Sequence, residues 1–255
     1  LGNILGNPLN RTSFGDLDIT STSGTLTIRG LGEGATIDGN QINRVFDVHE
    51  NNTLILENIT ITGGRAIEEQ SNDDGDGGGI FIHRDAAVIL DNCTISSNLS
   101  LSRGGGIANK GRLTVRNCNI SNNGAGQGGG ISSLFAITTI TDSNITNNVA
   151  INSIELGEGG GIYHGGDGST EIFNSTISNN KAQFLGGGIL GKRIEGFDAS
   201  ITIRDSTVSA NEARNGGGIG TNGVKPFIIE RTTINNNIAG IDGGGIYGNR
   251  IATTD

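Results

Sequence analysis

The sequence predicts an all-β fold, a single-stranded parallel β-helix in which about eight coils of three short strands each stack into a solenoid. Two observations predict it. The tetrapeptide Gly-Gly-Gly-Ile occurs seven times, at intervals of 24 to 31 residues. Aliphatic columns also recur upstream of each copy, spaced as in a β-strand. A unit of about 27 residues is too short to bury its own aliphatic side chains, so neighbouring units must stack.

The first strand of each coil carries two aliphatic columns that stand two residues apart, which is the strand period. These columns are Leu54, Val88, Leu113, Thr138, Thr170, Ile201 and Phe227, and Leu56, Leu90, Val115, Ile140, Ile172, Ile203 and Ile229.

The second strand is centred on an aliphatic anchor five residues further along. An odd step would place the anchor on the opposite face of a continuous strand, so a bend must separate the two strands. The bend column is mostly Asn and Asp, which tolerate turn conformations. Its members are Asn58, Asn92, Asn117, Asp142, Asn174, Asp205 and Arg231, and the anchors are Ile61, Ile95, Ile120, Ile145, Ile177, Val208 and Ile234.

A second corner is expected three residues after the anchor, where asparagine recurs and accepts the left-handed backbone conformation. Side-chain amides stacked at strand spacing hydrogen-bond one another, so we interpret this column as structural rather than as a binding surface. The expected asparagine ladder comprises Asn40, Asn98, Asn123, Asn148, Asn180, Asn211 and Asn237.

The third strand begins near a column of small residues, mostly alanine, and leads through a variable loop to Gly-Gly-Gly-Ile, which closes the coil. The register extends upstream, because Ile37 fits the anchor column and Phe46 the position of Ile80. We therefore expect an N-terminal segment over residues 1–20 and a β-helix domain over 21–255. The missing methionine and the lack of a terminal cap predict a segment of a longer protein.

Composition and charge exclude several classes of function. The 45 glycines among 255 residues stand at fixed columns, unlike those of collagen or a flexible linker. A formal charge of −9 without a basic cluster argues against nucleic acid as a partner. No apolar run reaches transmembrane length, so we expect no direct membrane insertion.

The string Ile177-Ser178-Asn179-Asn180 and the glycine-rich Gly186-Gly187-Gly188-Ile189 resemble the repeats of chlamydial polymorphic outer membrane proteins and related bacterial surface proteins. The resemblance covers roughly residues 24–249. It implies a right-handed β-helix, in agreement with the right-handed crossover rule, and an extracellular location, either secreted or on a bacterial outer membrane. It also implies an adhesive passenger region, and it supplies no catalytic residue.

Three sets of residues are candidates for local chemistry. Cys93 and Cys118 occupy one column in adjacent coils, within reach of a disulfide or as two stacked buried thiols. Asp73, Asp74 and Asp76 in an acidic insert are candidate calcium ligands, although acidic loops are more often merely solvated. The histidines His49, His83 and His164 fall in separated coils without metal-ligand spacing.

The sequence favours a non-enzymatic extracellular or cell-surface scaffold that presents loops for adhesion or assembly, with no cofactor unless calcium binds. Its expected partners are a protein or glycan at a cell surface, or further copies stacked end to end. The main alternative is a polysaccharide-active lyase, hydrolase or epimerase of the pectin-lyase-like class, for which Asp142 and Asp205 share a column two coils apart. A remote alternative is an ice-binding protein, because Thr and Ser flank the anchors.

Overall fold

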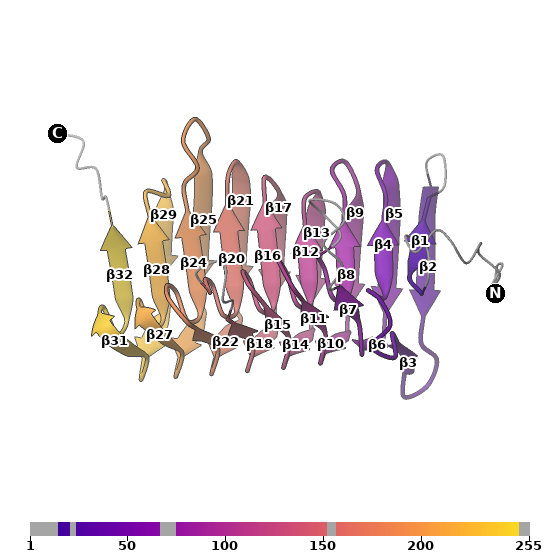
Figure 1. Cartoon of the computed structure of the whole chain (residues 1–255), viewed down its shortest axis with the longest axis horizontal. Helices are drawn as coiled ribbons and strands as arrows, with labels where there is room; N and C mark the ends of the chain where they lie inside the picture. Colours follow the sequence, from indigo (N-terminus) through magenta and orange to yellow (C-terminus); the bar gives the residue numbers. More distant parts are fainter. Residues whose placement is uncertain (1–14, 21–23, 67–74, 152–156, 250–255) are drawn as a thin grey trace.

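Parallel strands stacked in register run through the whole described chain and confirm the predicted parallel β-helix (Figure 1). The computed structural model describes residues 15–20, 24–66, 75–151 and 157–249. Within these residues the strands form four sheets, which we name A to D, and every pairing between strands is parallel. Nothing in this part of the chain is a helix long and apolar enough to cross a membrane.

Sheet A contains the Gly-Gly-Gly-Ile strands, and sheet B contains the paired aliphatic columns. Sheet A consists of β1 (Leu17–Ile19), β4 (Phe46–Val48), β8 (Ile80–Ile82), β12 (Ile107–Asn109), β16 (Ile131–Leu134), β20 (Ile162–Gly165), β24 (Ile189–Lys192), β28 (Ile219–Asn222) and β32 (Ile246–Asn249). Sheet B consists of β2 (Gly24–Arg29), β5 (Asn52–Glu57), β9 (Ala87–Asp91), β13 (Arg112–Arg116), β17 (Ile137–Thr141), β21 (Gly168–Phe173), β25 (Ala199–Arg204) and β29 (Phe227–Glu230).

Sheet C contains the aliphatic anchors, and sheet D follows the asparagine column. Sheet C consists of β3 (Ala35–Asp38), β6 (Ile59–Thr62), β10 (Thr94–Ser96), β14 (Asn119–Ser121), β18 (Asn144–Thr146), β22 (Thr176–Ser178), β26 (Thr207–Ser209) and β30 (Thr233–Asn235). Sheet D consists of β7 (Arg65–Ala66), β11 (Leu99–Ser100), β15 (Gly124–Ala125), β19 (Val149–Ala150), β23 (Lys181–Ala182), β27 (Glu212–Asn215) and β31 (Ile238–Asp242).

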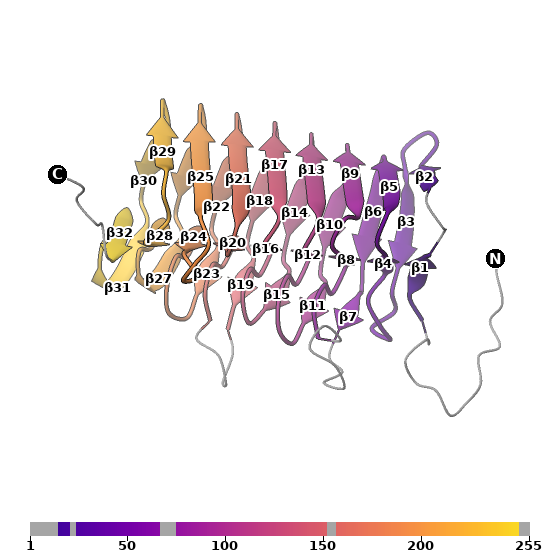
Figure 2. The ribbon, with the colours of Figure 1, turned by 90° about the horizontal axis from the view of Figure 1, so that it is seen from above.

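A full coil therefore has four strands where we expected three. The expected third strand is divided in two, and its first part is the short strand of sheet D (Figure 2), which lies at the alanine column. It is separate from sheet A because the first glycine of each triplet, for example Gly104 at φ +64°, turns the chain in the left-handed conformation. The next glycine lies in a crowded corner, since a Cβ on Gly105 would come within 2.3 Å of the Gly124 carbonyl oxygen.

The core fills the interior of the coils. The aliphatic side chains of the predicted columns are buried from Leu54 to Val208 and half-buried in the last coil, at Phe227, Ile229 and Ile234. They form one cluster together with the first isoleucine of each inner sheet A strand, such as Ile107 and Ile131. β1 lies within the expected N-terminal segment 1–20 and pairs with β4, so the stack also includes Leu17–Ile19. Burial of the core side chains fixes which residues of each strand point outward.

The two corners follow the sequence with one change. The bend column is left-handed throughout, from Asn58 at φ +55° to Arg231 at φ +45°. At the second corner the left-handed residue stands one position before the asparagine that we expected, as in Asn147 at φ +56° before Asn148. The reason is that Asn148 must point its amide inward, so the preceding residue makes the turn.

Candidate functional site

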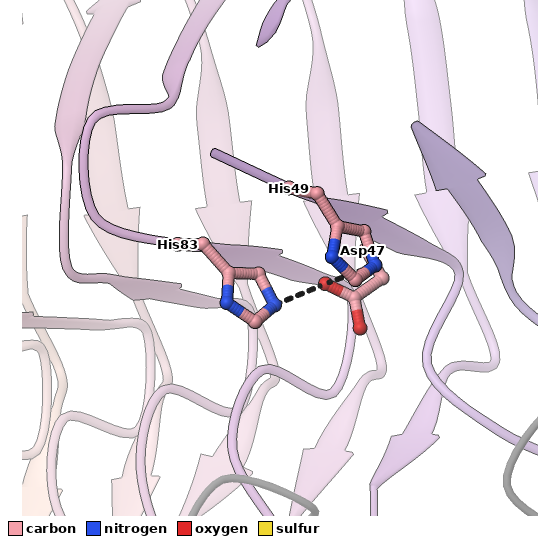
Figure 3. A group of neighbouring side chains, drawn as sticks. All are labelled: Asp47, His49 and His83. Atoms are coloured by element: carbon pink, nitrogen blue, oxygen red, sulfur yellow. Dashed lines mark hydrogen bonds and ion pairs between the residues drawn. The ribbon is translucent and has the colours of Figure 1, made fainter. Parts of the chain in front are cut away.

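A cluster of charged and imidazole side chains lies on the outer face of sheet A near the N-terminal end of the stack. We name it the Asp47 cluster, and its members are Asp16, Asp18, Arg44, Asp47, His49 and His83. Register creates it: Asp18 pairs with Asp47 across β1 and β4, and Val48 pairs with Ile82 across β4 and β8. The two histidines each follow one of these last paired residues, so they are neighbours on adjacent coils (Figure 3).

The imidazoles of the Asp47 cluster stack with their ring centroids 4.6 Å apart and their planes 13° apart. The Oδ1 atom of Asp47 lies 2.8 Å from Nε2 of His83 and 3.9 Å from Nε2 of His49 (Figure 3). Nε2 of His49 also lies 3.6 Å from Oδ1 of Asp18. One carboxylate oxygen therefore stands beside both histidines, and a second carboxylate stands beside the outer one.

Arg44 anchors the buried side of the cluster. Its Nη1 atom donates to Oδ2 of Asp47 at 3.3 Å, and its Nε atom lies 3.8 Å from Oδ2 of Asp16. Burial and the Asp18 charge raise the pKa of Asp16 to about 6. Burial also acts to raise the pKa of Asp47, but the hydrogen bond from His83 and the charge of Arg44 outweigh it and hold that pKa below its ordinary value.

A groove of about 590 Å³ opens beside the cluster, one coil further along. Lys110 links the two, because Asn109 pairs with Ile82 and so Lys110 follows in line with His83. The groove is lined by the turns between sheets A and B and by the first residues of sheet B strands. The lining includes Arg84, Asp85, Lys110, Arg112, Phe135, Asp167 and Phe197. Its volume is that of a typical small-ligand site.

Two aromatic rings form one wall of the groove. Phe135 and Phe197 pack edge to face with centroids 4.9 Å apart, and the Arg84 guanidinium lies 6.0 Å from the Phe135 ring centroid. Phe135 has φ +54°, at the position that Gly166 occupies in the next coil. A bulky residue in the left-handed region is strained, so the packing of this wall holds Phe135 in place.

The structure brings most of the expected asparagine ladder together. Five side chain to side chain hydrogen bonds of 2.9 to 3.1 Å join consecutive members from Asn98 to Asn237. Each donor amide also reaches the carbonyl oxygen of an anchor in the preceding coil, as from Asn148 to Ile120 at 2.9 Å. Asn40 lies apart from the ladder, because it is exposed and itself adopts φ +51°.

Of the three acidic residues that we expected to ligate calcium, Asp73 and Asp74 lie outside the described residues. Asp76 is fully buried, with Oδ2 3.3 Å from Nζ of Lys110 and 3.7 Å from Nη1 of Arg103. Burial raises the pKa of Asp76, and the two cations oppose that shift. Asp76 thus belongs to an ion-pair network under the sheet A face.

Cys93 and Cys118 lie in adjacent coils as two buried free thiols. The backbone N–H of Cys93 donates to Sγ of Cys118 at 3.3 Å, and the N–H of Cys118 donates to the Ser143 hydroxyl at 3.1 Å. The cysteines therefore continue a hydrogen-bonded column that serine occupies in the following coils.

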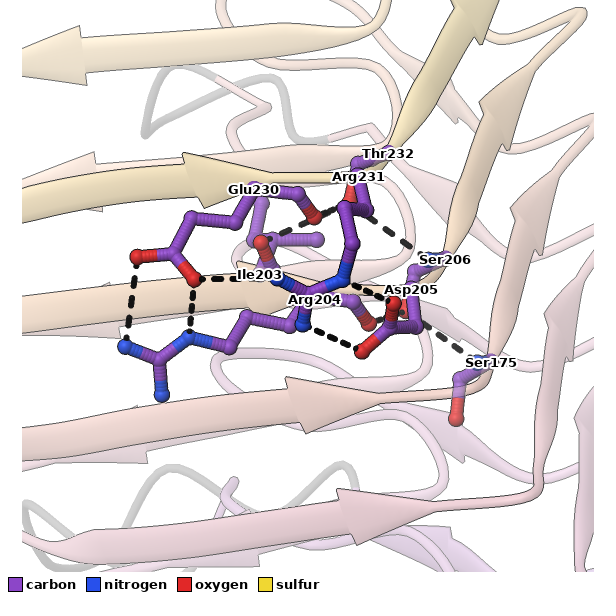
Figure 4. Close-up of polar contacts among 8 residues, drawn as sticks. All are labelled: Ser175, Ile203, Arg204, Asp205, Ser206, Glu230, Arg231 and Thr232. Carbon is purple, nitrogen blue, oxygen red and sulfur yellow. Dashed lines mark hydrogen bonds and ion pairs between the residues drawn. The ribbon is translucent and has the colours of Figure 1, made fainter.

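Each of the two aspartates in the bend column is bonded to the residue of the same column in the next coil. Arg231 holds Asp205 through two hydrogen bonds of 2.6 and 2.8 Å, beside the Arg204–Glu230 ion pair (Figure 4). Asp142 accepts a hydrogen bond from Asn174. Among the described residues, neither aspartate lines the groove beside the Asp47 cluster.

Sequence reasoning missed the Asp47 cluster, because it placed the three histidines in separated coils. His49 and His83 are in fact in adjacent coils and only His164 stands apart, buried inside the stack. The sequence alignment of the coils could have revealed this pair. Phe46 aligns with Ile80, and His49 and His83 each stand three residues after that column.

One comparison with known proteins gives a match. The profile of the family described as "Right handed beta helix region" matches residues 4–190, which is more than two thirds of the chain. No curated protein matches the chain.

Proposed function

Because this chain belongs to the family of right-handed β-helix regions, we propose that it is a non-enzymatic extracellular or cell-surface scaffold that binds an acidic glycan in its side groove. The location, secreted or on a bacterial outer membrane, is part of this proposal. One observation supports it most directly: the groove, which Asp85 and Asp167 also line, places two arginines beside an aromatic wall on a chain with a net charge of −9.

The chemistry of the groove suits a polymer of acidic sugars. Arg84 and Arg112 have no ion pair with any carboxylate of the described residues, so their guanidinium groups can receive a carboxylate or sulfate in bidentate fashion. The rings of Phe135 and Phe197 offer apolar surface for the faces of sugar rings. A rigid stack of coils holds these groups at fixed spacing, as multivalent adhesion requires.

The test is calorimetric titration with oligogalacturonate and heparin fragments, and with neutral cello-oligosaccharides for comparison. We expect binding of an acidic fragment that weakens about tenfold or more in Arg84→Ala and in Arg112→Ala. Arg116→Ala is the matched control, because Arg116 is an exposed arginine of the same strand β13 and does not line the groove. The proposal would be overturned if the affinity were unchanged in both Arg84→Ala and Arg112→Ala, or if the wild type bound no acidic fragment.

A polysaccharide-active enzyme is the second candidate, and the Asp47 cluster favours it. Its carboxylates and imidazoles lie one coil from the groove, where acid-base groups would stand beside a bound chain. Incubation with acidic polysaccharides distinguishes the two, since new reducing ends or unsaturated products that vanish in Asp47→Asn would establish catalysis. Binding without products supports the scaffold.

Two further proposals concern the ends of the stack and the outer face of sheet C. The outermost described coils expose Leu26 at one end and Ile238, Ile241 and Ile246 at the other, which suits self-assembly end to end. Concentration-dependent growth in analytical ultracentrifugation tests that assembly.

The Thr and Ser residues of sheet C, for example Thr176 and Thr207, face outward in register. Thermal hysteresis would be the sign of an ice-binding role, which remains a remote alternative.

A further inference from the structure

We propose that the Asp47 cluster is a binding site for a divalent transition-metal ion of the zinc class, with His49, His83 and Asp47 as ligands and Asp18 as the fourth. The candidate ligand atoms of Asp47, His49 and His83 lie within 4.8 Å of one another, as do those of Asp16, Asp18 and Asp47. This inference is independent of the glycan groove.

The distances between the candidate ligand atoms are near those that a tetrahedral ion needs. Zinc bonds of about 2.0 to 2.1 Å at tetrahedral angles place two ligand atoms roughly 3.3 Å apart. The observed separations from Oδ1 of Asp47, 2.8 Å to His83 and 3.9 Å to His49, lie on either side of that value. The 3.6 Å between Nε2 of His49 and Oδ1 of Asp18 is also close to it. Rotation of the more exposed His49 ring out of its stack on His83 would complete the site.

The surrounding contacts orient the ligands. Arg44 donates to Oδ2 of Asp47, which leaves Oδ1 directed at the two imidazoles. The Phe81 ring packs 4.4 Å from the His83 ring and limits its rotation. Protein metal sites usually have such hydrogen bonds and packing contacts, which orient the side chains that bind the ion.

Exposure gives an ion access to the site. The side chains of Asp47 and His83 are 14% and 25% exposed, and those of His49 and Asp18 are 41% and 45% exposed. An ion could thus approach from solvent past the outer pair and reach the inner pair. The backbone register holds His49 and His83 on adjacent coils, and because their rings are stacked, one ring must turn before both Nε2 atoms can bind the same ion.

The ligand types select the class of ion. Imidazole nitrogen suits zinc, cobalt, nickel and copper, whereas calcium takes six to eight oxygen ligands. Two histidines and two carboxylates therefore predict zinc-class binding without calcium competition. The acidic insert near Asp76 offers carboxylate oxygens and no imidazole. A calcium site there and a zinc site in the Asp47 cluster can therefore be distinguished by the ion that binds.

The test is calorimetric titration of the untagged chain with Zn²⁺ at neutral pH, and with Ca²⁺ in excess as competitor. We expect one Zn²⁺ per chain, an affinity about 100-fold lower in His49→Ala/His83→Ala, and one about tenfold lower or more in Asp47→Asn. Asp142→Asn removes the same charge from an exposed bend position where asparagine is the usual residue, and it should leave the affinity unchanged.

Cobalt gives a second measurement that does not depend on variants. Co²⁺ bound to nitrogen and oxygen ligands in a four-coordinate site should give strong visible absorption in the wild-type chain, and Zn²⁺ should displace it. Zinc binding that survives loss of both histidines would overturn the proposal, as would a Co²⁺ spectrum of the weak six-coordinate type. Binding that excess Ca²⁺ abolishes would overturn it as well.

Discussion

Asn148 lies in the middle of the asparagine ladder, and its replacement by alanine tests how the coils are held together. Its Oδ1 atom accepts from the backbone N–H and from Nδ2 of Asn123, both at 3.0 Å. Its Nδ2 group donates to Ile120 at 2.9 Å and to Asn180 at 3.0 Å. Alanine therefore leaves two buried donors of Asn123 without this acceptor, while Asn180 keeps its bond from the backbone of residue 148.

The magnitude follows from those two donors. A buried polar group left unsatisfied costs about 1 to 3 kcal/mol, so Asn148→Ala should lower the free energy of unfolding by about 2 to 6 kcal/mol. Guanidinium unfolding followed by circular dichroism measures the change. Asn237→Ala breaks the equivalent bonds to Asn211, but Asn237 is half-buried. Water can reach that position, so its loss should be about 1 kcal/mol.

The control is Asn147→Ala, one residue away. Asn147 is exposed and left-handed, and the equivalent position of a later coil is Ala210 at φ +54°, so alanine is tolerated there. We expect a loss of about 1 kcal/mol. If Asn148→Ala destabilises the protein no more than Asn147→Ala, the ladder does not stabilise the stack and the reasoning is refuted.

Three further predictions concern buried positions. Burial lowers the pKa of His164 to about 4 from 6.5, so the unfolded chain takes up the proton first. The stability contributed by this neutral histidine is complete above pH 6.5 and is lost as pH falls towards 4. In urea melts across that range, the free energy of unfolding of the wild type should fall by about 3 kcal/mol more than that of His164→Asn. Gly161→Ala would place a Cβ 2.6 Å from the Gly188 carbonyl oxygen and should lower the free energy of unfolding by about 1 to 3 kcal/mol. Gly240→Ala, with no atom closer than 3.8 Å to its Cβ, should lower it by less than about 1 kcal/mol. Equal melting temperatures of the two variants would contradict this prediction. Cys118→Ser should change stability by less than about 1 kcal/mol, because serine makes the same bonds in the next coils, and a thiol assay should find both cysteines unreactive until the chain unfolds.

The columns of the repeat could be predicted because each is a local consequence of residue type. The bend at Asn58 and the buried anchor Ile61 follow from spacing, since a strand alternates faces and asparagine tolerates the left-handed turn. The second corner was misplaced by one residue. The separation of sheet D from sheet A was missed, because two-residue strands such as β7 carry too few side chains to show a period.

The sequence by itself determined that the chain is a stack of parallel coils with an aliphatic interior, because in-register repetition leaves few other ways to bury those side chains. Only the tertiary structure decided which outward residues meet. His49 and His83 stand 34 positions apart in the chain, and Arg84 and Phe197 more than a hundred, yet each pair lines one site. The physical reason is that outward side chains carry no burial pattern, so their neighbours depend on coil length and turn geometry, which the loops set coil by coil.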